Sequence, residues 1–181
     1  MTKYLIIFLF VVTACCKEGN ETSKYLLTDF EKESIPYSEN ESVPFIHSNG
    51  FEFDLTVTSR TTVLNKTETQ HCGEDYSTYE TLLAELSSDT PEFYINFEVV
   101  PVTFNPHMTI KINKYYFDLD IVSDPDFDTL TINEKEFGQV YMADSFTTDT
   151  TVIRPHRVLY NKEVGIIQIS MTNNESYTIN Q

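Results

Sequence analysis

The sequence predicts an all-β protein, mainly antiparallel, with at most one short helix. Two observations support this prediction. Apolar and polar residues alternate with a period of two through much of the chain, and short Asn-, Gly-, Asp- and Ser-containing segments separate the alternating runs. One apolar and one polar face is typical of an antiparallel sheet with one wetted side. We therefore expect a single meandering curved sheet, in the form of a half-barrel, a barrel or a sandwich, because long open edges invite aggregation.

The expected strands are defined by their apolar positions, which a strand projects onto one face. These positions are Phe51, Phe53, Leu55 and Val57; Phe93, Ile95, Phe97 and Val99; Ile110 and Ile112; Phe117, Leu119 and Ile121; Leu130 and Ile132; Ile167, Ile169 and Met171; and Tyr177 and Ile179. Asn49-Gly50 is the strongest turn signal, since both residues tolerate a positive φ. The spacing of the turn signals predicts about eight to ten strands.

One stretch, residues 76–87, fits two kinds of element. Tyr79, Leu82, Leu83 and Leu86 have the spacing of one helix face, whereas Leu82, Ala84 and Leu86 also alternate as in a strand. The sequence therefore predicts either one short helix or a long strand that leads to a turn at residues 88–91.

The N-terminus has the features of a secretory signal. Lys3 precedes an unbroken apolar run at residues 4–12, which is about half the ~20 residues that a membrane-spanning helix needs. Small residues, Thr13 and Ala14, then precede Cys15. We expect a signal peptide at residues 1–14, a modified cysteine and polar tether at residues 15–24, and a single β-rich domain at residues 25–181.

The segment from Val12 to Cys15 resembles the lipobox of bacterial lipoproteins. The resemblance implies that the signal is cut before Cys15, that Cys15 carries a diacylglycerol, and that its new amino group is acylated with palmitate or a similar chain. Several acyl chains anchor a protein stably, whereas one does not. The expected partner is thus a membrane of the bacterial envelope, the outer membrane, on its periplasmic or its surface side.

Charge excludes one class of partner. The chain has a formal net charge of −16, and removal of residues 1–14, with Lys3 as their only charged residue, makes it −17. Such a surface repels nucleic acid and anionic lipid head groups. No nucleic-acid partner is expected.

Candidate sites are few. Asp124, Asp126 and Asp128 have a spacing that can surround calcium, but Thr129 and Lys135 occupy positions where an EF-hand loop needs Gly and Glu, so we expect a solvated acidic turn. The four histidines show no zinc-site spacing, and no nucleophile or phosphate-binding motif is present. The sequence therefore predicts a non-enzymatic protein without a cofactor.

Modification and cysteine pairing give further candidates. The segments around Thr129 and Thr150 resemble the O-glycosylation motif of the Bacteroidetes, an Asp followed by Thr or Ser and then an apolar residue or Thr. Cys72 is expected to be buried and unpaired, with a Cys16–Cys72 bridge as the alternative, because spacing alone does not define the geometry that a disulfide needs.

Two segments, Ile35-Pro36-Tyr37 and residues 160–169, together with a final aromatic strand at residues 176–179, resemble uncharacterised lipoproteins of flavobacteria. The resemblance carries no activity. We expect a structural or binding module of the envelope, with an unknown protein or glycan partner. The alternative is a carrier that encloses a hydrophobic ligand in a curved sheet. A filled core is expected, because each large apolar side chain contributes about 1.5–3 kcal/mol when buried.

Overall fold

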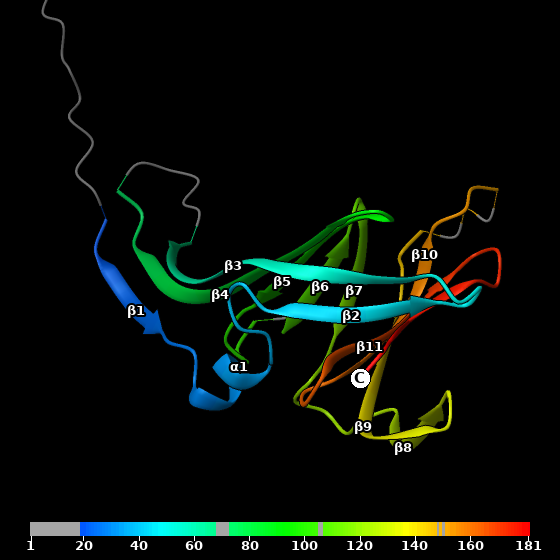
Figure 1. The fold of residues 1–181 in the computed structure, drawn as a ribbon. Helices are drawn as coiled ribbons and strands as arrows, with labels where there is room; N and C mark the ends of the chain where they lie inside the picture. Colours follow the sequence, from blue (N-terminus) through cyan, green and yellow to red (C-terminus); the bar gives the residue numbers. More distant parts are fainter. Residues whose placement is uncertain (1–18, 68–72, 105–106, 148, 150) are drawn as a thin grey trace, which may run out of the picture.

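The computed structural model describes residues 19–67, 73–104, 107–147, 149 and 151–181 (Figure 1). Cys15, Cys16, Cys72 and Thr150 lie outside the described residues, as does the expected signal peptide. The elements in chain order are β1 (Glu21–Tyr25), α1 (Asp29–Glu33), β2 (Ser42–His47), β3 (Glu52–Lys66), β4 (Tyr76–Asp89), β5 (Glu92–Val99), β6 (Met108–Ile112), β7 (Tyr115–Leu119), β8 (Phe127–Ile132), β9 (Lys135–Asp144), β10 (Pro155–Asn161), β11 (Gly165–Met171) and β12 (Ser176–Ile179).

The strands form one open, mainly antiparallel sheet, as the sequence predicts. Its order is β7-β6-β5-β4-β3-β2-β12-β11-β10-β9-β8, and β1 joins β4 as a parallel strand off this path. The described residues hold twelve strands, more than the eight to ten expected. Part of the excess has a physical reason: β1 carries no large apolar alternation, and it is a strand because it pairs with the edge of β4. β9 and β10 were also not among the expected strands.

Residues 76–87 are strand, not helix. They belong to β4, which pairs with β3 on one side and with β5 on the other. Leu82, Ala84 and Leu86 are fully buried on the face expected from their alternation. Residues 76–87 therefore adopt the strand that their period-two alternation predicts. The neighbouring strands supply hydrogen-bond partners to the backbone of the segment.

The sheet is open but curls, so that strands far apart along it pack across one core. β7 lies against β9 and β10, although these strands are far apart along the sheet path. The ring of Phe97 on β5 lies 6.2 Å from that of Tyr160 on β10 and 5.5 Å from that of Tyr37. The largest fully buried side chains are Tyr160, Phe45, Phe97, Phe117, Ile35, Leu55, Leu82, Leu86, Ile95, Met108, Ile110 and Ile112. The apolar faces thus pack on one another.

One expected core residue is exposed. Phe51 lies at the β2–β3 hairpin, 48% exposed, and stacks on Phe53 at a centroid distance of 6.3 Å. Farther along β3, Leu55 and Val57 are buried as expected. Alternation predicts the face on which Phe51 lies. It does not predict that Phe51 stands in the hairpin just before β3, where that face is no longer covered.

Residues 34–37 seal the core next to the β10–β11 hairpin. The hydroxyl of Tyr160 donates to the carbonyl of Ser34, and the backbone N–H of Ile166 donates to the hydroxyl of Tyr37 over 2.6 Å. Gly165 has a φ of +82°, and a Cβ there would overlap the Tyr37 ring and hydroxyl. The two segments that resemble flavobacterial lipoproteins therefore meet in the core.

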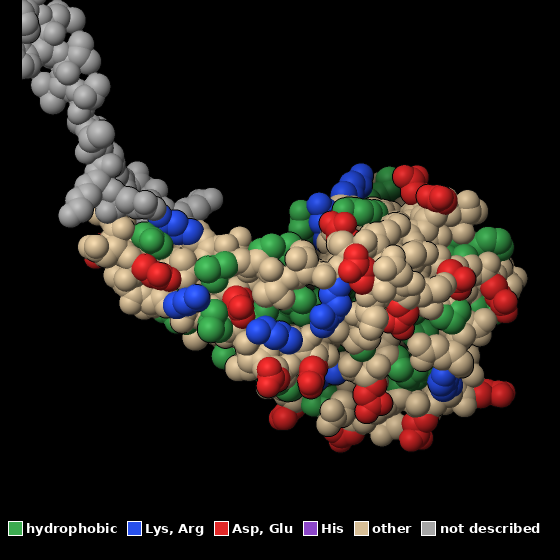
Figure 2. All heavy atoms as spheres, turned by 60° about the vertical axis from the view of Figure 1, so that its left-hand side comes forward, with side chains coloured by type: hydrophobic (Ala, Val, Ile, Leu, Met, Phe, Trp, Pro, Cys, Tyr) green, Lys and Arg blue, Asp and Glu red, His purple; other side chains and the backbone are tan. Residues whose placement is uncertain are grey.

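The ends of β3 and β4 extend beyond the body, together with β1 (Figures 1 and 2). We call this three-stranded extension, residues 20–27, 60–67 and 73–81, the arm. Residues 21–24 were expected in the tether, but they form β1, and Asn20 already bonds to the backbone of Tyr76 and the side chain of Asp75. The folded part thus begins earlier than predicted.

The helix α1 packs beside the arm. Thr28 caps it, and the Glu31 carboxylate accepts a hydrogen bond from the Thr28 backbone N–H, which completes a capping box. Nowhere in the described chain does a helix have the length and apolar composition needed to cross a bilayer.

Candidate functional site

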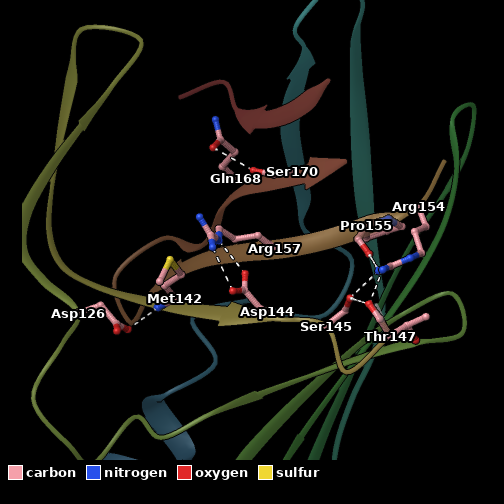
Figure 3. A network of polar contacts seen from close by, with 10 residues as sticks. All are labelled: Asp126, Met142, Asp144, Ser145, Thr147, Arg154, Pro155, Arg157, Gln168 and Ser170. Carbon is pink, nitrogen blue, oxygen red and sulfur yellow. Dashed lines mark hydrogen bonds and ion pairs between the residues drawn. The ribbon is translucent and has the colours of Figure 1, made fainter. Parts of the chain in front are cut away.

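The three aspartates of the calcium candidate, Asp124, Asp126 and Asp128, do not form a cluster. Asp126 uses a carboxylate oxygen to accept a hydrogen bond from the backbone N–H of Met142 over 2.7 Å, so it joins the loop before β8 to β9 (Figure 3). Asp124 is exposed in the same loop, and Asp128 lies in β8. Among the described residues, no group of three or more His, Cys, Asp or Glu side chains is placed to hold a metal ion. The calcium candidate therefore gains no support.

The modification candidates and the histidines are dispersed. Thr129 is exposed on β8 and faces Gly138 across the β8–β9 pair, while Cys15, Thr150 and His71 lie outside the described residues. His47 is buried on β2, where its ring lies 4.6 Å from that of Tyr177. The structure does not bring His47, His107 and His156 together into one site.

A buried arginine organises the connection between β9 and β10. Arg154 is 2% exposed, and its guanidinium donates to the carbonyls of Asp149 (2.6 Å), Pro155 (3.1 Å) and Thr147 and to the hydroxyl of Ser145 (2.6 Å) (Figure 3). A buried charge is tolerated when hydrogen bonds replace its hydration. The planar fork of the guanidinium can meet several acceptors at once. Arg154 therefore holds Ser145, Thr147 and Asp149 against the start of β10.

The backbone of the same residue is tied to the next turn. Arg154 N–H donates to the Thr172 hydroxyl over 3.2 Å, and Thr172 N–H donates to the Arg154 carbonyl over 2.9 Å. The Thr172 hydroxyl in turn donates to the carbonyl of Val152 over 2.8 Å. These bonds join the β9–β10 connection to the β11–β12 turn, and we call the two together the rim.

An open groove lies on this rim. It has a volume of about 410 Å³ and is lined by Asp144, Ser145, Thr147, Arg154, His156, Thr172 and Asn174. Its lining residues all have polar side chains, although apolar atoms supply the larger part of the exposed lining surface. The hydroxyl, amide and carboxylate groups among them can meet polar groups of a partner.

One wall of the groove is an ion pair. Arg157 donates from Nε and Nη2 to the two carboxylate oxygens of Asp144, at 2.7 and 3.0 Å (Figure 3). These hydrogen bonds lower the pKa of Asp144, and partial burial opposes them. Asp144 therefore stays ionised and fixed in direction, as the fork geometry of Arg favours.

Apolar side chains stand beside the groove. Phe146 and Ile153 are each 68% exposed, and Val152 is 47% exposed, all in the β9–β10 connection. Exposed apolar side chains that gather beside a polar groove are typical of protein interaction sites. We refer to the groove with these three side chains as the rim site.

A second buried polar group lies near α1. His107 is 3% exposed, and neither ring nitrogen has a hydrogen-bond partner. Burial lowers its pKa, against the attraction of Glu31 and Asp120. The Glu31 carboxylate already accepts three hydrogen bonds, from Val102 N–H over 2.7 Å and from the N–H and the hydroxyl of Thr28. His107 therefore serves as a neutral packing residue at this end of the core.

Of the rim-site residues, only His156 was weighed from the sequence, as one of the four histidines without zinc-site spacing. Arg154 and Arg157 flank Pro155 and His156, and nothing in that spacing indicates that Arg154 is buried. Arg154 is buried because the β9–β10 connection folds around it, and these tertiary contacts cannot be read from the local sequence.

Comparisons with known protein families, with curated proteins and with solved structures give no match to this chain. The resemblance to flavobacterial lipoproteins therefore stays a prediction from the sequence, and the function has to be argued from the residues and the geometry.

Proposed function

We propose that this protein is an envelope lipoprotein, anchored in a membrane through lipid on Cys15, and that its β domain acts as a non-enzymatic binding module. The rim site is the proposed binding surface for a protein or glycan partner. The observation that carries the proposal is the placement of the two ends. The described chain begins at the arm, four residues after Cys15, and the β9–β10 connection lies at the opposite side of the molecule (Figure 1).

This arrangement suits an anchored binding module. A lipid on Cys15 holds the arm end close to the membrane, because four residues span at most about 14 Å. The rim site then points away from the bilayer, where a partner can reach it. Packing also favours this function over a carrier: Phe97, Tyr160 and Phe117 fill the space between the limbs of the curled sheet.

The anchor is tested with two neighbouring cysteines. Cys15→Ala removes the proposed lipid acceptor, so the full-length chain should move from the detergent phase to the aqueous phase on Triton X-114 partitioning, or should accumulate uncut. Cys16→Ala is the matched control, and it should partition as the wild type does. Detergent-phase partitioning of Cys15→Ala would contradict the proposal, as would a loss of partitioning in Cys16→Ala alone.

A further inference from the structure

One face of the arm carries lysines and leucines together. Thr78 on β4 pairs with Lys66 of β3 on one side and with Lys24 of β1 on the other. Residues opposite one another in a sheet project to the same face. The two lysines therefore flank Thr78 on one surface, and both are exposed.

Apolar side chains share this surface. Leu64 lies two residues before Lys66 and is 54% exposed, and Leu26 lies two residues after Lys24 and is 53% exposed. The Lys66 ammonium sits 3.5 Å from the ring centroid of Tyr76, which is two residues before Thr78. Two carboxylates share this surface: Glu80 stands opposite Leu64, and Glu21 accepts a hydrogen bond from the Thr78 hydroxyl. Glu80 is itself paired with Lys32 and accepts from the backbone N–H of Leu27. We call Lys24, Leu26, Leu64, Lys66 and Tyr76 the arm face. Figure 2 shows basic, acidic and apolar side chains along the arm.

The arm differs in charge from the rest of the molecule. Its basic residues are Lys24, Arg60 and Lys66, and its acidic residues are Glu21, Glu74, Asp75 and Glu80, so the arm is close to neutral. The whole chain has a net charge of −16, which the remaining parts therefore carry almost entirely. Head-group phosphates thus repel the arm less than they repel the rest of the molecule taken together.

The chain leading to Cys15 leaves from the arm. Tyr76 N–H donates to the carbonyl of Asn20 over 3.0 Å, and Asn20 N–H donates to Asp75 over 2.9 Å. A residue larger than glycine at Gly19 would overlap the backbone of Glu74. The chain is therefore fastened to the arm as far as Gly19, and only residues 16–18 separate it from Cys15.

We propose that the arm face rests on the phospholipid bilayer, with Leu26 and Leu64 at the boundary between head groups and acyl chains and with Lys24 and Lys66 on the phosphates. This rests on the proposed lipid anchor at Cys15. Lysine and tyrosine suit such a boundary, because each has an apolar body and a polar end. The anchor and the arm face then act as two contacts, which orient the domain as well as hold it.

The test uses the absence of tryptophan from the sequence. Leu64→Trp places a single fluorophore on the arm face, and Phe51→Trp places one at the far end of β3, about 43 Å away along the strand. Each full-length protein is purified from membranes and reconstituted into vesicles of phosphatidylethanolamine and phosphatidylglycerol, with or without bromine on the acyl chains. Leu26→Trp is a second probe of the arm face, should Leu64→Trp fold poorly.

Bromine should remove most of the fluorescence of Leu64→Trp and little of that of Phe51→Trp. Adding Lys24→Glu and Lys66→Glu to Leu64→Trp should cut the quenching several-fold, while the lipid keeps the protein on the vesicles. Equal quenching at both positions, or none at Leu64 in a protein that floats with the vesicles, would overturn the arm face but leave the anchor intact. Failure of every variant to float would overturn the anchor, and the arm face with it.

Discussion

At the scale of single residues, Gly165 shows how a glycine can be required by its surroundings. Its φ is +82°, and the Tyr37 hydroxyl occupies the space that a Cβ would take. Gly165→Ala should therefore lower the free energy of unfolding by about 2–4 kcal/mol, through backbone strain and displacement of Tyr37. Urea denaturation measures the change.

Gly138→Ala is the control for that substitution. A Cβ at Gly138 would lie 3.9 Å from its nearest neighbour, the carbonyl oxygen of Asp128, which is an ordinary contact distance. This variant should keep wild-type stability to within about 1 kcal/mol. A Gly165→Ala protein as stable as Gly138→Ala would show that the contact between Tyr37 and the β10–β11 hairpin is not formed.

His107 gives the domain a predicted pH dependence. Burial holds its pKa below the ordinary value of about 6.5, so the unfolded chain binds a proton at a higher pH than the folded chain does. Stability should therefore fall as the pH drops below about 6.5, until the lowered pKa of the folded state is reached. The pKa values of Glu31 and Asp120 are both lowered from the ordinary carboxyl range, so their contribution lies in a separate, more acidic window.

The measurement is urea denaturation at about pH 7.5 and about pH 5.5, on the wild type and on His107→Phe. The variant keeps an aromatic ring in the core but cannot bind a proton, so it should lose most of the difference between the two pH values. An unchanged difference in His107→Phe would assign the pH dependence to another group.

At the scale of elements, alternation predicted the strands whose two faces differ. β5, β6 and β7 are the clearest, since Ile95, Ile110 and Phe117 and their neighbours at every second position are buried as expected. It could not predict β1, whose side chains are polar and whose conformation depends on the edge of β4. It also did not decide whether β4 is a helix or a strand, because its leucines fit both spacings. Pairing with β3 and β5 decides for the strand.

The β9–β10 connection is the element on which the rim site depends. Arg154→Ala would leave the carbonyls of Thr147 and Asp149 without their buried donor, and we expect a loss of about 3 kcal/mol in stability. The same variant should be cut faster by proteases within residues 145–153, because the connection loses its anchor.

Arg157→Ala is the matched control, two strand positions after Pro155. Its ion pair with Asp144 is partly exposed, so its removal should cost no more than about 1 kcal/mol and should not speed cleavage. Comparable cleavage of the two variants would contradict the role of Arg154 as the anchor of the rim site.

At the scale of the whole molecule, one sheet folds around one core, with the arm at one side and the rim site at the other. Polar patterning in the sequence indicated the sheet and its curl but not which strands would meet across the core. That pairing depends on contacts such as Phe97 with Tyr160, which are 63 residues apart and come together only when β7 folds over β9 and β10. For the same reason the sequence did not show that the arm and the rim site lie at opposite sides.

The lipid anchor at Cys15 is tested most directly by the intact mass of the protein extracted from membranes. The predicted mass is that of a chain beginning at Cys15, increased by one diacylglyceryl group on the thiol and one acyl chain on the amino group. A membrane-extracted chain that begins at Cys15 without added lipid, or one that keeps residues 1–14, would contradict the account.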